Sequence, residues 1–238
     1  MKISLIIPMY NEEAIVEATL REVSEYMKST FLEDYEILCV NDGSTDKTPS
    51  LVAAFPDPAV KLVSYGENRG KGYAVRRGAL AAAGDVVLFT DCDLAYGTGV
   101  IKTFYDVLTS PEAPDLAVGS RVLHERGYGE YTLLRRLVSR TYILVLKILG
   151  GLRLSDSQCG CKGFRLAAAK TIFSVAEVDR FAFDFEAILL AEHFGMRFCE
   201  VPVAVERHGK SSVRVVRDTL RMLRDLRRMK KRIKAMEK

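Results

Sequence analysis

Two aspartates separated by one residue, Asp91 and Asp93, have the types and spacing that suggest chemistry most directly. They follow residues 85–90, an apolar run that predicts a buried strand, so the chain leaves the interior and at once presents two carboxylates. Two unpaired carboxylates repel each other, and a bound divalent cation removes that repulsion. Hard oxygen ligands select Mg²⁺ or Mn²⁺. We therefore predict a metal site at Asp91 and Asp93, with Asp93 also catalytic; the alternative is an ordinary capped turn.

Two further polar clusters follow predicted strands. The first strand is followed by Met9-Tyr10-Asn11-Glu12-Glu13, and the second by Asn41-Asp42-Gly43-Ser44. One such loop is ordinary turn chemistry, but three at one sheet edge indicate a binding site. Asp42 could accept the N–H groups of a uracil or a guanine.

A glycine-containing loop follows the third predicted strand. Residues 68–72 read Asn-Arg-Gly-Lys-Gly, and Lys71 begins a predicted helix whose N-terminus favours anions. The loop suits a diphosphate or a sugar. The alternative interpretation of the same residues is a tight turn with an exposed lysine. A dinucleotide dehydrogenase is disfavoured because no G-x-G-x-x-G follows the first strand.

Alternating strands and helices must position these loops. Apolar patterns predict strands at residues 3–8, 36–40, 60–65, 85–90, 116–119 and 197–203, and helices at residues 12–28, 46–55, 71–83, 100–108, 131–149, 167–173, 183–194 and from about 213 onward. Residues 155–165 read as a loop. Repeated βα units predict an α/β fold with a mainly parallel, Rossmann-like sheet flanked by helices. Ligands bind such sheets at the carboxyl ends of the strands.

Composition places these elements in one domain with a basic appendage. Residues 214–238 contain eleven Lys/Arg and three Asp/Glu, whereas the rest of the 238-residue chain contains 24 basic and 28 acidic residues. No apolar run reaches the roughly 20 residues of a transmembrane helix, and the N-terminus does not resemble a signal peptide. The five cysteines do not suggest a disulfide framework, so we expect a cytoplasmic protein with reduced thiols.

The predicted last helix is amphipathic. Its apolar residues recur at spacings of four and three, and basic residues cover its other faces: Val215, Thr219, Met222, Leu226, Met229, Ile233 and Met236 form the apolar stripe. A basic amphipathic helix can lie on an anionic membrane surface. The same stripe could equally pack on the body of the protein or on a second subunit, and the oligomeric state stays open.

The motifs together resemble family 2 glycosyltransferases. The resemblance is carried by Ile6-Ile7-Pro8-x-Tyr10-Asn11-Glu12, Val40-Asn41-Asp42-Gly43-Ser44, Asn68-Arg69-Gly70-Lys71-Gly72 and Asp91-x-Asp93. It implies a GT-A fold, a nucleotide-sugar donor and inversion at the anomeric carbon. The donor-binding residues would be Pro8, Tyr10, Asn11, Glu12, Asp42, Lys71 and Asp91. The GT-A domain would span residues 1–212, with a nucleotide-sugar half at 1–120 and an acceptor half at 121–212, followed by the helix at 213–238.

The second half resembles the polyprenyl- and dolichyl-phosphate hexose synthases, and most closely the dolichyl-phosphate beta-glucosyltransferases. The motifs are Val118-Gly119-Ser120-Arg121, the loop Asp156-Ser157-Gln158-Cys159-Gly160-Cys161-Lys162 and Arg180-Phe181-Ala182-Phe183-Asp184-Phe185-Glu186. Cys161 departs from the aromatic residue usual there. The branch implies transfer of glucose from UDP-glucose to a polyprenyl phosphate. Many relatives have transmembrane helices that this sequence lacks, and the basic amphipathic helix instead predicts peripheral attachment to the membrane. GDP-mannose as donor, or a soluble glycan or protein as acceptor, are the alternatives.

Several polar residues of the second half suit a phosphate acceptor. A phosphate monoester is largely dianionic at neutral pH and needs charge balance more than a strong base. Arginines supply that balance by bidentate contact. The predicted acceptor-phosphate residues are Arg121, Arg135, Ser139, Gln158, Arg207 and Ser211. Asp156 is assigned near the acceptor as a base or as a loop organiser, with Asp184 and Glu186 as rivals. A nucleic-acid binder is disfavoured because that reading leaves the acidic loops unexplained.

Overall fold

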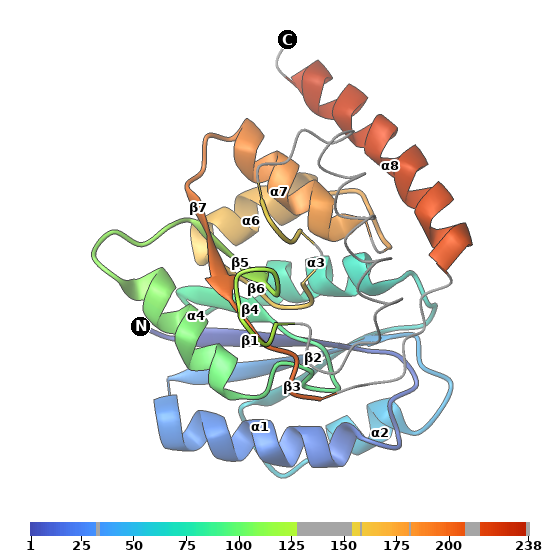
Figure 1. Cartoon of the computed structure of the whole chain (residues 1–238). Helices are drawn as coiled ribbons and strands as arrows, with labels where there is room; N and C mark the ends of the chain where they lie inside the picture. Colours follow the sequence, from blue (N-terminus) through green and yellow to red (C-terminus); the bar gives the residue numbers. More distant parts are fainter. Residues whose placement is uncertain (32–33, 128–153, 158, 181, 208–214, 237–238) are drawn as a thin grey trace.

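A seven-stranded sheet forms the centre of the computed structural model (Figure 1), which describes residues 1–31, 34–127, 154–157, 159–180, 182–207 and 215–236, with side chains in the last segment from Asp225 onward. The strand order is β3-β2-β1-β4-β6-β5-β7. The strands are β1 (Ile3–Met9), β2 (Tyr35–Asp42), β3 (Val60–Tyr65), β4 (Val86–Phe89), β5 (Leu116–Ser120), β6 (Lys162–Arg165) and β7 (Phe198–Pro202). Four of the six strand pairs are parallel, which confirms the predicted mainly parallel sheet.

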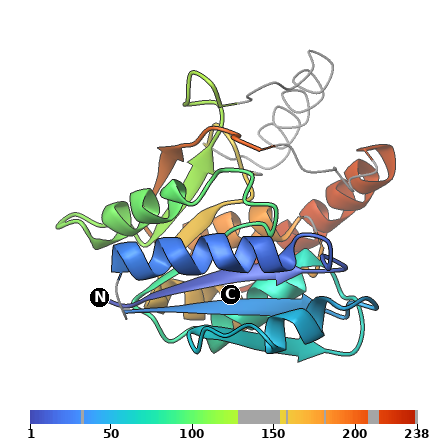
Figure 2. The same cartoon turned by 90° about the horizontal axis from the view of Figure 1, so that it is seen from below.

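Helices cover both faces of this sheet (Figures 1 and 2). One face carries α1 (Val16–Phe31), α2 (Thr48–Ala53) and α4 (Gly99–Thr109), and the other carries α3 (Lys71–Ala81), α6 (Leu166–Val175) and α7 (Phe183–His193). Strand β1 shows why both faces are occupied. Leu5 packs in the core on the α1 side, whereas its neighbour Ile6 packs in the core on the α3 side. Both side chains are buried, as expected for a central strand of a two-sided sheet.

One element differs from the sequence prediction. The pattern predicts a loop over residues 155–165, but Lys162–Arg165 form β6, which lies antiparallel between β4 and β5. The four residues Lys-Gly-Phe-Arg carry neither an apolar run nor a clear alternation, so the pattern gave no strand signal. Neighbouring strands on both sides, rather than local preference, determine this conformation.

The C-terminal helix α8 (Val215–Met236) packs on the body of the protein through the part of its stripe that the structure describes. Leu226 and Met229 are buried in the core beside α7, and Ile233 packs against the same core. Met236 is 41% exposed. Of the interpretations left open by the sequence, packing on the body is therefore the one observed for these residues. Among the described helices, none combines the length and apolar character required to cross a bilayer.

Candidate active site

The carboxyl ends of β1, β2 and β4 bring the predicted donor-side loops together next to the N-terminus of α3. Asp91 follows β4, and its Oδ1 forms an ion pair with Nζ of Lys71, the first residue of α3. Gly160 lies against this pair: a Cβ added there would be 2.3 Å from Asp91 Oδ2 and 3.5 Å from Lys71 Nζ. The loop before β6 therefore approaches the Asp91 carboxylate so closely that no side chain fits at residue 160 without moving it.

The electrostatics at this edge are those of a crowded acidic site. Burial raises the pKa of Asp93 above its ordinary value, and the charge of Asp91 raises it further. Burial likewise raises the pKa of Glu12, with the charges of Asp93 and Asp91 adding to the effect. Burial alone would lower the pKa of Lys71, but the neighbouring Asp91 and Asp184 outweigh it and raise that pKa. A positive charge is therefore strongly favoured here.

The donor set at this edge fits a hard divalent cation. Asp91 and Asp93 offer carboxylate oxygens, which suit Mg²⁺ or Mn²⁺, and their mutual repulsion is the cost that such a cation removes. Within the described residues, no group of three or more His, Cys, Asp or Glu is arranged to hold a metal. Mg²⁺ typically uses one or two protein carboxylates and completes its shell with substrate phosphates and water, so two aspartates suffice.

The loops after β1 and β2 are held to each other. The backbone N–H of Asn11, a residue with φ of 56°, donates to the Ser44 hydroxyl, and Asn11 Oδ1 accepts the N–H of Thr45 at 2.9 Å. The N–H of Glu12 donates to Thr48 Oγ1 at 2.8 Å. Tyr10 is 46% exposed at the rim, and Pro8 lies within β1. The predicted donor residues of the first loop thus lie on one braced edge.

Asp42 organises the glycine-containing loop that precedes α3. Its carboxylate accepts hydrogen bonds from the Tyr65 hydroxyl, the Asn68 amide and the backbone N–H groups of Arg69 and Gly70, at 2.8 to 3.0 Å. A carboxylate has about four acceptor positions, so these donors use its capacity. Recognition of a base by Asp42 stays a prediction, and the described geometry gives the residue a loop-holding role.

On the other side of β4, Arg121 and Asp156 form a buried bidentate pair. Arg121 Nε and Nη2 donate to the two carboxylate oxygens of Asp156 at 2.7 and 3.0 Å. Asp156 is fully buried, and Arg121 follows β5 at the same sheet edge. Burial would lower the pKa of Arg121, but the bonds to Asp156 outweigh it and hold that pKa well above its ordinary value. Of the two roles predicted for Asp156, this geometry favours the loop organiser over the base.

The remaining predicted acceptor residues are only partly described. Arg207 donates through both terminal nitrogens to Glu22 on α1, at 2.7 and 2.8 Å, which ties the segment after β7 to α1. Its contact with an acceptor phosphate stays a prediction. Arg135, Ser139, Gln158 and Ser211 lie outside the described residues, as does the predicted helix 131–149.

A buried pair that sequence reasoning did not single out lies behind the site. Lys162 on β6 is fully buried and donates to Asp184 at 2.6 Å and to the carbonyl oxygen of Cys159 at 2.8 Å. Burial raises the pKa of Asp184, while Lys162 and Lys71 oppose the rise. A lysine between apolar residues was the available signal, but its partner is distant in sequence. The pair fixes the loop that carries Gly160.

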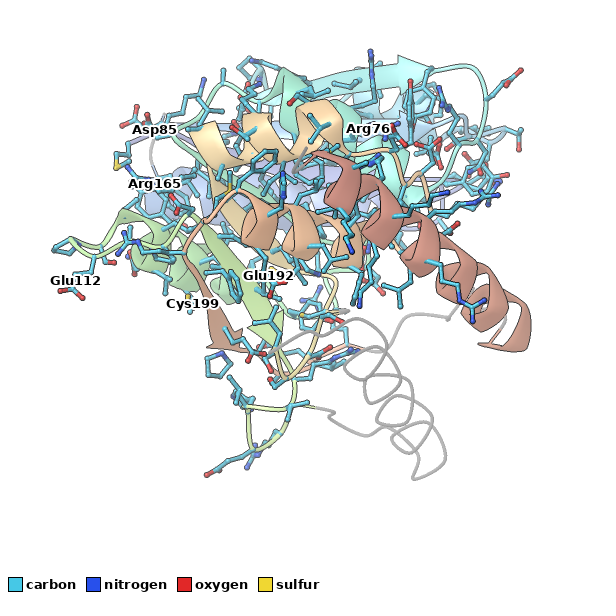
Figure 3. All side chains as sticks on the ribbon, turned by 90° about the horizontal axis from the view of Figure 1, so that it is seen from above. Arg76, Asp85, Glu112, Arg165, Glu192 and Cys199 are labelled. Atoms are coloured by element: carbon cyan, nitrogen blue, oxygen red, sulfur yellow. The ribbon has the colours of Figure 1, made fainter. Side chains whose placement is uncertain are left out.

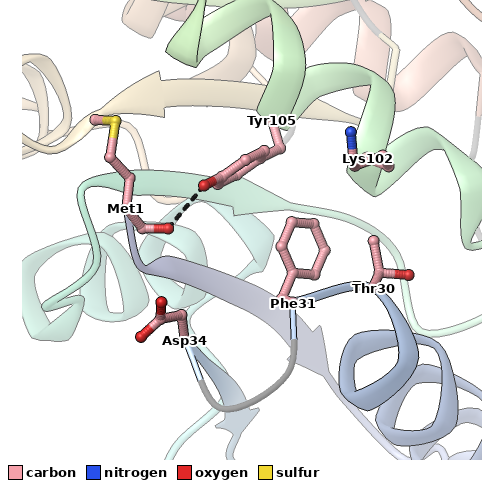
Figure 4. A pocket seen from close by; sticks show the side chains of 6 residues that line it. All are labelled: Met1, Thr30, Phe31, Asp34, Lys102 and Tyr105. Atoms are coloured by element: carbon pink, nitrogen blue, oxygen red, sulfur yellow. Dashed lines mark hydrogen bonds between the residues drawn. The ribbon is translucent and has the colours of Figure 1, made fainter.

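The molecule also has a small pocket at the opposite end of the sheet (Figure 4). Its volume is about 190 Å³, and its lining residues are Met1, Thr30, Phe31, Asp34, Lys102 and Tyr105. These residues precede β1 and β2 or lie on α1 and α4, far from the strand ends that carry Asp91 and Asp42. We assign the candidate site from the convergence of charged groups rather than from this pocket.

Comparison with known sequences agrees with the geometry. The profile of glycosyl transferase family 2 matches residues 4–173. A dolichyl-phosphate beta-glucosyltransferase of Trichomonas vaginalis is 32% identical over 225 residues, which cover 89% of this chain and 66% of the relative. The human dolichyl-phosphate beta-glucosyltransferase is 29% identical over 215 residues, covering 85% of this chain and 66% of the relative. The chain thus spans just under two thirds of the length of these relatives.

Among solved structures, glucosyl-3-phosphoglycerate synthase from Mycobacterium tuberculosis, crystallised with Mn²⁺ and UDP-glucose, is similar with a TM-score of 0.70. The two sequences are 21% identical, and the match covers 94% of this chain and 78% of the synthase. At this level of sequence identity, the structural similarity is evidence for the fold alone.

Proposed function

Because the chain belongs to glycosyl transferase family 2, whose GT-A fold it shares, we propose that it transfers glucose from UDP-glucose to a polyprenyl phosphate, with inversion at the anomeric carbon. The observation that carries the proposal is the meeting of Lys71, Asp91 and Asp93 at the carboxyl edge of the sheet. The resemblance to dolichyl-phosphate beta-glucosyltransferases supports the choice of sugar and acceptor.

The donor side is built to receive a diphosphate. Asp91 and Asp93 would hold Mg²⁺ or Mn²⁺, and such an ion would take up the negative charge that develops on the leaving UDP. Lys71 begins α3, so its ammonium and the helix N-terminus both present positive charge at the same place. Asp42 keeps the backbone of residues 69 and 70 in position for this task.

The acceptor needs little activation. An oxygen of the lipid phosphate would attack the anomeric carbon as the bond from that carbon to the diphosphate breaks. Because the phosphate is already largely dianionic at neutral pH, no strong base is required. This fits the described state of Asp156, which is buried and paired with Arg121. Arg121, together with Arg135, Ser139, Gln158, Arg207 and Ser211, is the proposed phosphate-binding set.

We further propose that the protein associates with an anionic membrane surface through the outer face of α8. The apolar residues Leu226 and Met229 are buried on the body, whereas Arg227, Arg228 and Lys231 are exposed. Basic residues near an anionic leaflet favour adsorption. The helix would then lie against lipid with its charged face while its apolar face holds the body.

The test is a calorimetric titration of UDP-glucose and of GDP-mannose, each with and without Mn²⁺, followed by transfer assays with a polyprenyl phosphate. Metal-dependent binding of UDP-glucose, and labelled glucose in the lipid fraction, are expected. Binding of GDP-mannose alone would move the assignment to a mannose synthase. Transfer to a soluble glycan without any lipid phosphate would refute the proposed acceptor.

A further inference from the structure

A short segment, residues 176–180, links the C-terminal helix to the N-terminus of α3; we refer to it as the bracing loop. On the α3 side, the N–H of Tyr73 donates to the carbonyl oxygen of Asp179 at 3.1 Å. Arg76, labelled in Figure 3, donates to the carbonyl oxygen of Ala176 at 2.8 Å and to the Asp179 carboxylate at 2.6 Å. Arg69 reaches the same carboxylate at 3.2 Å. The bracing loop therefore holds the turn that contains Lys71.

The backbone of the bracing loop lies in close contact with the backbone at the start of α3. A Cβ added to Gly70 would lie 2.6 Å from the carbonyl oxygen of Asp179, and one added to Gly72 would lie 2.5 Å from that of Val178. Lys71 sits between these two glycines. Because backbone meets backbone here, a displacement of the bracing loop must displace the residues on either side of Lys71.

On its other side, the bracing loop is held by a buried carboxylate, Glu186 on α7, which is 1% exposed. Glu186 accepts the backbone N–H of Glu177 at 3.0 Å and that of Val178 at 2.8 Å. Burial raises the pKa of Glu186, although the N–H groups of Val178 and Glu177 and the charge of Arg232 oppose the rise. A carboxylate buried in this way requires a nearby cation to stay charged.

The C-terminal helix provides that cation. Arg232 Nη2 donates to Glu186 at 2.8 Å, and Nη1 pairs with the Glu177 carboxylate at 2.7 Å. Its side chain is 20% exposed and is held between α8, α7 and the bracing loop. Leu226 and Met229, buried about two turns and one turn earlier, fix the helix that carries it. Arg232 lies outside residues 4–173, the part that the family profile matches.

We propose that Arg232 is a positioning residue for nucleotide-sugar binding, acting through Glu186 and the bracing loop on the turn that carries Lys71. The inference rests on the proposed function in naming the ligand as a nucleotide sugar. Loss of Arg232 removes the cation that is directly paired with the Glu186 carboxylate and leaves only the more indirect charge of Arg76 in its support, so the carboxylate takes up a proton or draws in water more readily. Either change weakens its hold on the N–H groups of residues 177 and 178. The C-terminal helix is then part of the donor site's support as well as an outer surface.

The experiment compares Arg232→Gln with Lys234→Gln in the full chain. Lys234 is exposed two residues further along α8, so the control removes one positive charge from the same turn without touching Glu186. Two readouts are measured: hydrogen exchange of the amides of residues 73, 177 and 178, and calorimetric binding of UDP-glucose with Mn²⁺. In Arg232→Gln we expect these amides to exchange about tenfold faster or more, and UDP-glucose to bind about 2- to 30-fold more weakly. Lys234→Gln should match the wild type in both.

Equal exchange and equal affinity in the two folded variants would overturn the inference. If Arg232→Gln does not fold, the double variant Arg232→Gln/Glu186→Gln removes both charges together; faster exchange at residue 73 in that variant supports the linkage, and wild-type exchange refutes it. If the wild type binds no nucleotide sugar, the proposed function fails, and the exchange comparison still decides whether Arg232 holds the turn of α3.

Discussion

Substitution of Gly160 by alanine should separate stability from donor binding. The added methyl carbon would lie 2.3 Å from Asp91 Oδ2, and real contacts of a Cβ essentially never fall below 3.0 Å, so the carboxylate oxygen must retreat by at least about 0.7 Å. That atom is the end of a side chain that is 35% exposed, so it can move without disturbing the core. We therefore expect the free energy of unfolding to change by less than about 1 kcal/mol.

The consequence for metal binding is larger. Metal–ligand distances in protein sites are expected within about 0.2 Å of their usual values, and a displacement of the Asp91 oxygen by about 0.7 Å exceeds this tolerance. Disturbing residues that orient metal ligands typically costs about 10- to 100-fold in metal affinity or activity, and we expect a loss of that size. Calorimetric titration of Mn²⁺ with UDP-glucose measures it, and thermal unfolding of the same sample checks the fold.

Gly99→Ala serves as the matched control, because a Cβ at Gly99, the first residue of α4, meets nothing within 4 Å and therefore displaces no side chain. It should bind like the wild type. Wild-type affinity in a folded Gly160→Ala variant would show that the position of Asp91 is not what the metal-dependent step requires, and the reasoning from this contact would be wrong.

Three other predictions concern charge. Asp93→Ala should abolish nearly all turnover with little loss of stability, because the carboxylate is repelled by Asp91 in the free protein; unchanged metal-dependent activity would contradict the metal assignment. Burial raises the pKa of Glu36, but hydrogen bonds from Lys61, Ser4 and Ala83 outweigh this effect and hold the pKa below its ordinary value. The stabilisation of the folded state by Glu36 is therefore present above about pH 4.3 and is lost as the pH falls below that value. Glu36→Gln should therefore cost about 1–3 kcal/mol at pH 7, with the gap from wild type closing in acid during denaturant titrations; a gap that stays constant would refute this. Replacing Arg227, Arg228 and Lys231 by glutamine should lower binding to anionic vesicles by roughly fivefold per residue in sedimentation assays, and unchanged binding would exclude the outer face of α8 as the membrane surface.

The sequence could predict those parts of the fold that depend on local pattern. Runs such as Ile3–Met9 and Val60–Tyr65 placed these strands correctly, and the polar loops that follow strands were the basis for predicting the binding edge. Lys162–Arg165 could not be found in this way, because its strand conformation depends on β4 and β5 on either side. The same holds for the pairs Lys162–Asp184 and Arg121–Asp156: each residue could be noted, but its partner is chosen by the fold. For α8, the sequence shows the apolar stripe, but it does not show which surface the stripe packs against.

The central position of β6 has a consequence for the order in which the protein is made. During synthesis, β4 ends at Phe89 but its antiparallel neighbour begins only at Lys162, and β5 pairs only with β6 and β7 among the described strands. A nascent chain that has emerged as far as β5 therefore carries β3, β2, β1 and β4 as a half-sheet with an exposed edge. Such edges invite pairing with other chains. We expect the interval before residue 165 is released to be the period in which the folding chain depends most on protection from aggregation.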